Sequence, residues 1–197
     1  QAVEAATQAL ILREPKRLDR VFELEALINQ SHIEVDDSCV NLLARQSPLA
    51  KDLRLIVAIM KINTDLERMG DQAVNIAFNA KRYLDEQPLK PLIDLPKMAQ
   101  EVRTMVRETL DAFLNRDEAL AQKVLDRDDL VDEFKDKIFR ELITYMTADS
   151  KTIERAMNLI LIARNLERLG DHATNIAEDV IFAISGRRAR SFSSMAG

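Results

Sequence analysis

Apolar residues recur along two long stretches of the chain at alternating spacings of four and three. In the first stretch they are Leu55, Ile59, Ile62, Leu66, Met69, Ala73, Ile76 and Ala80. In the second, one hundred residues later, they are Leu159, Ile162, Leu166, Leu169, Ala173, Ile176 and Val180. This alternation places one apolar stripe along a helix and is typical of the packing seam of a helical bundle. The pattern predicts two long helices that occupy equivalent places in two similar bundles.

Prolines and capping residues divide the rest of the chain into helices. Prolines stand at 15, 48, 88, 91 and 96, and none interrupts a good apolar period. Aromatic residues make up 5% of the chain and only four residues are glycine, which favours helices over sheets. The predicted helices span 1–13, 17–46, 48–86, 97–114, 117–147 and 150–185.

These six long helices predict an all-α fold of two tandem, pseudo-symmetric three-helix bundles. The N-terminal bundle covers 1–88, and because the chain opens inside a helix we expect its first helix to be truncated. The C-terminal bundle covers 92–186. A flexible tail rich in arginine and serine follows at 187–197.

A repeated segment within the two seams indicates duplication. Residues 62–77 read INTDLERMGDQAVNIA and residues 162–177 read IARNLERLGDHATNIA, with ten of the sixteen positions identical. Each copy carries two acids four residues apart, namely Glu67 and Asp71, then Glu167 and Asp171. Residues four apart share a helix face, where like charges destabilise a helix by about 0.2–0.5 kcal/mol. The retained pairs therefore indicate a site.

A glycine stands between the two acids of each pair, at Gly70 and Gly170. Mid-helix glycine costs about 1 kcal/mol relative to alanine. Either a neighbouring helix packs very closely there, or a ligand approaches the backbone beside the carboxylates. The sequence leaves both explanations open.

The preceding helix of each bundle carries further candidate ligands. If the last two helices lie side by side, four carboxylates converge, from Asp132, Asp136, Glu167 and Asp171. An offset of one hundred places His32 and Asp36 at the positions of Asp132 and Asp136, and His172 is either a polar surface residue or an outer ligand. Clustered carboxylates must take up protons or bind cations such as Mg, Ca, Mn, iron or zinc. The predicted metal ligands are Glu67, Asp71, Asp132, Asp136, Glu167 and Asp171, with Asp36 and His32 as secondary members.

Composition excludes several other functions. A net charge of −5 argues against binding to nucleic acid, and no apolar run is long enough to span a membrane. A single cysteine, Cys39, fits a reducing compartment and reads as a buried apolar residue, so we expect a cytoplasmic protein without a signal peptide. No Glu-x-x-His motif, P-loop or nucleophile elbow is present, and we expect no catalytic residues.

The repeated motif resembles the signature of the PhoU family of bacterial phosphate-uptake regulators. The similar segments are TDLERMGDQAVNIA at 64–77, NLERLGDHATNIA at 165–177, PLAKDLRL at 48–55 and LITYMTADS at 142–150. The resemblance implies two three-helix bundles whose acidic E(D)-x-x-x-D motif pairs hold metal clusters, for instance multinuclear iron or zinc, with His32 as a departure. It also implies repression of the phosphate regulon by linking a phosphate ABC transporter ATPase to a sensor histidine kinase.

Three functions therefore compete. The leading hypothesis is a non-enzymatic, metal-binding signalling adaptor that forms a homodimer and reaches the membrane only through its partners. The alternatives are a metal-dependent hydrolase or oxidase, and a purely structural helical scaffold. Under the leading hypothesis, the site with His32 should bind hard cations more weakly than the all-carboxylate site.

Overall fold

The computed structural model describes residues 1–89 and 91–186, and every regular element in that part of the chain is helical. The elements are α1 (Ala2–Leu12), η1 (Pro15–Leu18), α2 (Asp19–Gln46), α3 (Ala50–Leu84), α4 (Asp94–Asn115), α5 (Glu118–Leu125), α6 (Asp128–Ala148), η2 (Ser150–Thr152) and α7 (Ile153–Ser185). The predicted all-α class is confirmed. The predicted tail at 187–197 lies outside the described residues.

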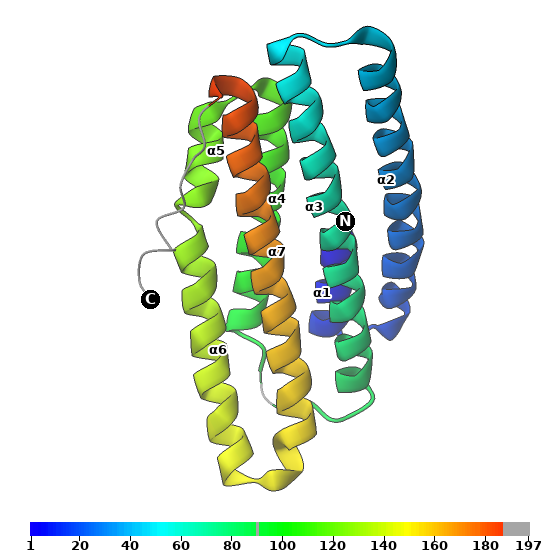
Figure 1. Ribbon diagram of the computed structural model, residues 1–197. Coiled ribbons are helices and arrows are strands. Elements are labelled where there is room, and N and C mark those ends of the chain that lie inside the picture. Colours follow the sequence, from blue (N-terminus) through cyan, green and yellow to red (C-terminus); the bar gives the residue numbers. More distant parts are fainter. Residues whose placement is uncertain (90, 187–197) are drawn as a thin grey trace.

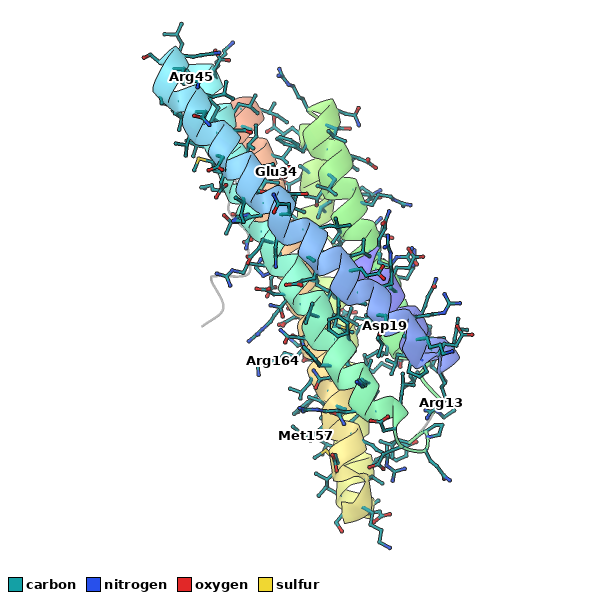
Figure 2. All side chains as sticks on the ribbon, turned by 90° about the vertical axis from the view of Figure 1, so that its right-hand side faces the viewer. Arg13, Asp19, Glu34, Arg45, Met157 and Arg164 are labelled. Atoms are coloured by element: carbon teal, nitrogen blue, oxygen red, sulfur yellow. The ribbon has the colours of Figure 1, made fainter. Side chains whose placement is uncertain are left out.

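Two bundles share one long central contact. Figure 1 shows α3 and α7 side by side, with α1 and α2 beside α3 and with α4, α5 and α6 beside α7. The α2–α3 and α6–α7 connections lie at opposite ends of the molecule. Figure 2 shows the same elongation, because Arg45 near the end of α2 and Met157 near the start of α7 lie far apart. The predicted division at 88–92 stays a prediction, since one apolar core runs through both bundles.

The predicted apolar seam forms the centre of this core. All seven predicted seam positions of α7 are buried, and none is more than 1% exposed. On α3, Leu55, Ile59 and Leu66 are partly exposed and the other five predicted positions are buried. Cys39 is buried as predicted, at 4% exposure. The alternating spacing therefore identified the faces through which α3 and α7 pack.

The helix predicted for 117–147 is wrong in one respect, because the chain breaks at Asp126 and Arg127 into α5 and α6. Asp117 caps α5 by accepting a 2.9 Å hydrogen bond from the backbone N–H of Leu120. At the break, the guanidinium of Arg127 forms ion pairs with Glu101 and Glu108 of α4. This contact ties the turn to a neighbouring helix, and periodicity within 117–147 carries no information about it.

Candidate metal site

The packing around the two glycines shows how the bundles correspond. A methyl group added at Gly70 would lie 3.4 Å from Ile28 of α2, and one added at Gly170 would lie 3.5 Å from Val131 of α6. Val131 comes 103 residues after Ile28, although the glycines themselves are one hundred apart. A close neighbouring side chain therefore occupies the space beside each glycine, which is the first of the two explanations that the sequence left open.

The same offset of 103 relates the first helices. Arg13 and Arg116 end α1 and α4, and both adopt the left-handed conformation, with φ of 54° and 53°. The predicted equivalence of His32 with Asp132, which assumed an offset of one hundred, is therefore wrong. With an offset of 103, His32 corresponds to Lys135, and the first copy has three more residues between its second helix and its motif.

In the C-terminal bundle, α6 and α7 bring four carboxylates together. We call these the acidic cluster: Asp128, Asp132, Glu167 and Asp171. One cation lies among them, because Lys135 Nζ donates to Asp132 Oδ1 at 2.7 Å and to Glu167 Oε1 at 3.1 Å. The acidic cluster therefore contains four carboxyl groups and one lysine ammonium group.

The titration of the acidic cluster reflects this excess of negative charge. Partial burial, then the charges of Glu167, Asp128 and Asp132, raise the pKa of Asp171 to about 6. Burial and the neighbouring acids also raise the pKa of Asp128. Burial disfavours the charge of Lys135, but its two hydrogen bonds outweigh that effect and raise its pKa. The cluster favours any additional positive charge.

Three of the four residues named from the sequence influence one another's charge, namely Asp132, Glu167 and Asp171. The fourth, Asp136, lines a groove of about 400 Å³ together with Lys135 and Glu167 of the acidic cluster and with Phe139 and Arg164. Its place beside Asp171 is taken by Asp128, whose charge contributes to the raised pKa of Asp171. Sequence reasoning missed Asp128, although it stands four residues before Asp132 and therefore shares its helix face.

In the N-terminal bundle His32 and Glu67 line one pocket of about 370 Å³, but the predicted ligands have two sets of close partners. Glu67 and Asp71 flank Arg68, whose guanidinium lies 3.5 Å and 3.6 Å from their carboxylates. His32 and Asp36 instead meet Asn63. Asn63 Nδ2 donates to Asp36 Oδ1 at 2.9 Å, and His32 Nδ1 lies 3.3 Å from the Asn63 carbonyl oxygen.

The residues that correspond to Asp128 and Asp132 in the N-terminal bundle are Glu25 and Asn29. Asn29 Nδ2 donates to Glu25 Oε1 at 2.7 Å. A neutral amide therefore stands where the acidic cluster has a carboxylate. The two sites differ in composition at Asn29 as well as at His32, and the predicted difference in metal binding stays a prediction.

The donor set of the acidic cluster suits a hard cation, although the side chains are not arranged around one. Within residues 1–89 and 91–186, no three His, Cys, Asp or Glu side chains meet in a geometry that could hold an ion. Carboxylate oxygens are the ligands that Mg, Ca, Mn and iron prefer. An ion held by Asp132 and Glu167 would have to displace Lys135, which donates to both in this structure.

His172 lies at the contact between α7 and α3. Its Nδ1 lies 2.7 Å from Asp65 Oδ1 on α3, and Asn175 Nδ2 donates to the same oxygen at 3.4 Å. The side chains of His172 and Asp65 are 20% and 17% exposed. His172 is therefore neither a plain surface residue nor directed at the acidic cluster, and it joins the two bundles.

The fold and the site define a duplicated, all-helical protein with an acidic motif on the last helix of each bundle. A family model described as the PhoU domain matches residues 1–80 and 95–180. The chain therefore belongs to the PhoU family. Among the described residues, no helix is long and apolar enough to cross a membrane.

Relatives and solved structures agree with this assignment. A phosphate-specific transport system accessory protein PhoU homolog from Pseudomonas aeruginosa is 41% identical over 189 residues, covering 95% of this chain and 78% of the relative. A homolog of the same name from Aquifex aeolicus is 39% identical, covering 85% and 76%. The crystal structure of PhoU from Pseudomonas aeruginosa superposes with a TM-score of 0.91 at 40% identity, covering 94% of this chain and 90% of that one. The Streptococcus pneumoniae PhoU structure gives 0.87 at 25% identity, covering 96% and 89%.

Proposed function

We propose that this protein is a cytoplasmic, non-enzymatic negative regulator of phosphate uptake. It links a phosphate ABC transporter ATPase to a sensor histidine kinase and carries metal ions in its acidic sites. The observation that supports the metal is the acidic cluster of four carboxylates, in which Lys135 donates to only two, Asp132 and Glu167. The regulatory role rests on membership of the PhoU family and on relatives named as accessory proteins of phosphate-specific transport.

When bound, a divalent or trivalent cation supplies the positive charge that the acidic cluster lacks. Asp128 and Asp132 of α6 and Glu167 and Asp171 of α7 would hold it. Because these residues come from two helices, a bound ion would also strengthen the α6–α7 contact. We propose no catalytic step, because all four carboxylates of the acidic cluster would act as ligands of the bound ion.

Isothermal titration calorimetry with Mn²⁺ tests the metal sites. The tighter binding step should disappear in Asp171→Ala and persist in Asp71→Ala, because the N-terminal bundle has the neutral amide of Asn29 in place of the carboxylate of Asp132. Persistence of the tight step in Asp171→Ala, with its loss in Asp71→Ala, would reverse the ranking of the two sites.

A deletion strain tests the regulatory role. Phosphate transport genes should stay on in high phosphate, and the wild-type gene should restore their repression. Normal repression without the gene refutes the proposal. We also propose a homodimer, which analytical ultracentrifugation measures directly. Turnover of phosphate esters by the metal-loaded protein would instead favour the hydrolase alternative.

A further inference from the structure

A groove of about 460 Å³ lies where α3 begins and where α4 and α7 end. Figure 1 shows these three helix ends together near the top of the molecule, far from the α6–α7 connection. Apolar side chains, including Ile59, Phe113 and Val180, form the floor of the groove. Leu114 stands on its edge with 76% of its surface exposed. The groove therefore offers apolar surface to another molecule.

The charge on this groove is opposite to that of the chain as a whole. Lys51, Arg54 and Arg116 line it with a single acid, Asp52, whereas the whole chain carries a net charge of −5. Within the described part of the chain, the side chains of Lys51 and Arg116 make no ion pair or hydrogen bond. Arg54 Nε is buried without a hydrogen-bond partner there. The groove is a local positive patch with uncommitted donors.

At the C-terminal end of α3, on the opposite end of the molecule, arginine side chains bond to backbone carbonyl groups. Arg13, the counterpart of Arg116, donates to the carbonyl oxygens of Leu84 at 3.1 Å and Glu86 at 2.5 Å, at the end of α3. Arg155 donates to the carbonyl oxygen of Gln87 at 3.3 Å. Those arginines complement the partial negative charge of a helix C-terminus.

At the groove a different arginine lies at the helix end. Arg54 lies directly against Gly186, the residue that ends α7 in the left-handed conformation. Lys51 and Arg116 are exposed and line the groove beside its apolar surface, where their charges are open to a partner.

We propose that this groove docks an acidic, partly apolar segment of a partner protein. Apolar side chains of the segment cover Leu114 and the floor, while its carboxylates meet Lys51 and Arg116. The inference rests on the proposed adaptor function, because it supposes a protein partner. Rim charges of this kind set the association rate and its salt dependence, and the buried apolar contact sets the dissociation rate.

Two other occupants fit the groove less well. The residues at 187–197 include Arg187, Arg188 and Arg190, which have the same charge as the groove. A small anion such as inorganic phosphate matches the cations but leaves the apolar floor and Leu114 in water. A segment with both acids and apolar side chains satisfies both parts of the surface.

Charge reversal tests the inference. The double variant Lys51→Glu/Arg116→Glu is compared with Lys16→Glu/Arg20→Glu, which makes the same charge change on exposed residues of η1 and α2. The probes are the purified transporter ATPase and the purified soluble cytoplasmic part of the sensor kinase, titrated in turn by biolayer interferometry. We expect the groove variant to bind one of them at least tenfold more weakly and with less salt dependence, and the control variant to bind as wild type.

The outcomes separate the two proposals. Wild-type protein that binds neither probe removes the adaptor function and this inference with it. Equal binding by the groove variant and wild type overturns only the inference. Thermal melting checks that the variant is folded, and Leu114→Ser, which keeps every charge, is the second variant and should weaken the same complex.

Photocrosslinking locates the contact independently. Benzoylphenylalanine in place of Leu114 should crosslink to an acidic stretch of the bound probe, whereas the same group in place of Phe139, which is 46% exposed on α6, should not. A crosslink from position 114 to a second copy of this chain or to its own residues 187–197 overturns the inference. So does a groove variant that loses binding of inorganic phosphate while it keeps both protein partners.

Discussion

Asp171 carries the charge that the acidic cluster compensates least. Lys135 bonds to Asp132 and Glu167, and Asp171 is left with a pKa of about 6. The charged form of this carboxyl is therefore unfavourable in the folded protein without metal. The same property that weakens the metal-free fold favours a bound cation, so stability and binding should respond in opposite directions to its removal.

Asp171→Asn should stabilise the metal-free protein at pH 7.5. The folded pKa is raised above the unfolded value of about 3.9, so the Asp171 carboxyl loses stabilising free energy as pH rises from about 4 to about 6. Because the side chain is partly exposed, we expect a gain of about 1 kcal/mol at pH 7.5 and little change near pH 4. Urea denaturation with a chelator measures both. A less stable variant at pH 7.5 contradicts the cause assigned to this pKa.

Lys135→Met should make stability more dependent on metal. Loss of the ammonium leaves the partly buried carboxylates without their internal partner, which costs about 1–3 kcal/mol in the metal-free protein. Added Mn²⁺ should recover more stability in this variant than in wild type, measured as the shift in Tm. Lys151→Met removes an exposed lysine outside the acidic cluster and is the control. Equal Mn²⁺ shifts in all three proteins would exclude competition between Lys135 and the ion.

Local periodicity predicted whole helices well, because the spacing of apolar residues reports the face that each helix buries. It failed at Asp126 and Arg127, where the break depends on ion pairs from Arg127 to Glu101 and Glu108 on another helix. The motif on α3 and α7 revealed Glu67, Asp71, Glu167 and Asp171. It could not reveal the offset of 103, because the second helices share too little sequence to be aligned by eye.

The lysine within the acidic cluster escaped prediction for a related reason. Lys135 stands between Asp132 and Asp136 in the sequence, and spacing alone does not show whether it points with the acids or away from them. Its hydrogen bond to Glu167 depends on how α6 packs against α7. Contacts between helices decide such details, and they are set by the whole core.

Gly170→Ala should stabilise α7 by about 0.5–1 kcal/mol. The added Cβ would meet Val131 Cγ1 at 3.5 Å, an ordinary contact, and alanine favours helix by about 1 kcal/mol over glycine. Gly70→Ala should gain less, because two atoms of Ile28 lie at 3.4 Å. Urea denaturation gives the stability and Mn²⁺ titration gives the affinity. A stable Gly170→Ala protein with lost affinity would show that the ion needs the open backbone.

At the scale of the molecule, pairs of polar side chains connect α3 to α7. Asp65 and His172 meet at 2.7 Å, and Lys61 Nζ donates to Asp179 Oδ1 at 2.8 Å. The repeat places Asn165 and Gln72 at the positions of Asp65 and His172, and both are buried. Two neutral amides therefore stand at the pseudo-symmetric positions of an ionisable pair, where Asn165 Nδ2 donates to the Leu161 carbonyl oxygen and Gln72 Oε1 is buried without a hydrogen-bond partner in the described part of the chain.

Asp65→Leu should cost about 1–3 kcal/mol, because it leaves the partly buried His172 without its acceptor. The double variant Asp65→Asn/His172→Gln copies the amides of the other side and should cost less than the single change. A double-mutant cycle of Asp65→Asn, His172→Gln and the double variant, measured by urea denaturation, gives the coupling between the two side chains. Additive effects of the two changes would show that the Asp65–His172 contact contributes nothing to the stability of the α3–α7 packing.

The contact between α3 and α7 also makes the two halves of the chain depend on each other. The stripe on α7 is buried against surfaces on both sides, so a separated half would leave an apolar strip in water. Cut between α3 and α4, the pieces 1–89 and 91–197 should find each other when they are co-expressed, and either alone should aggregate or pair with itself. The connecting peptide then acts as a tether that raises the local concentration of one half around the other to about the millimolar range. In that sense the single chain is a dimer whose partners were joined end to end.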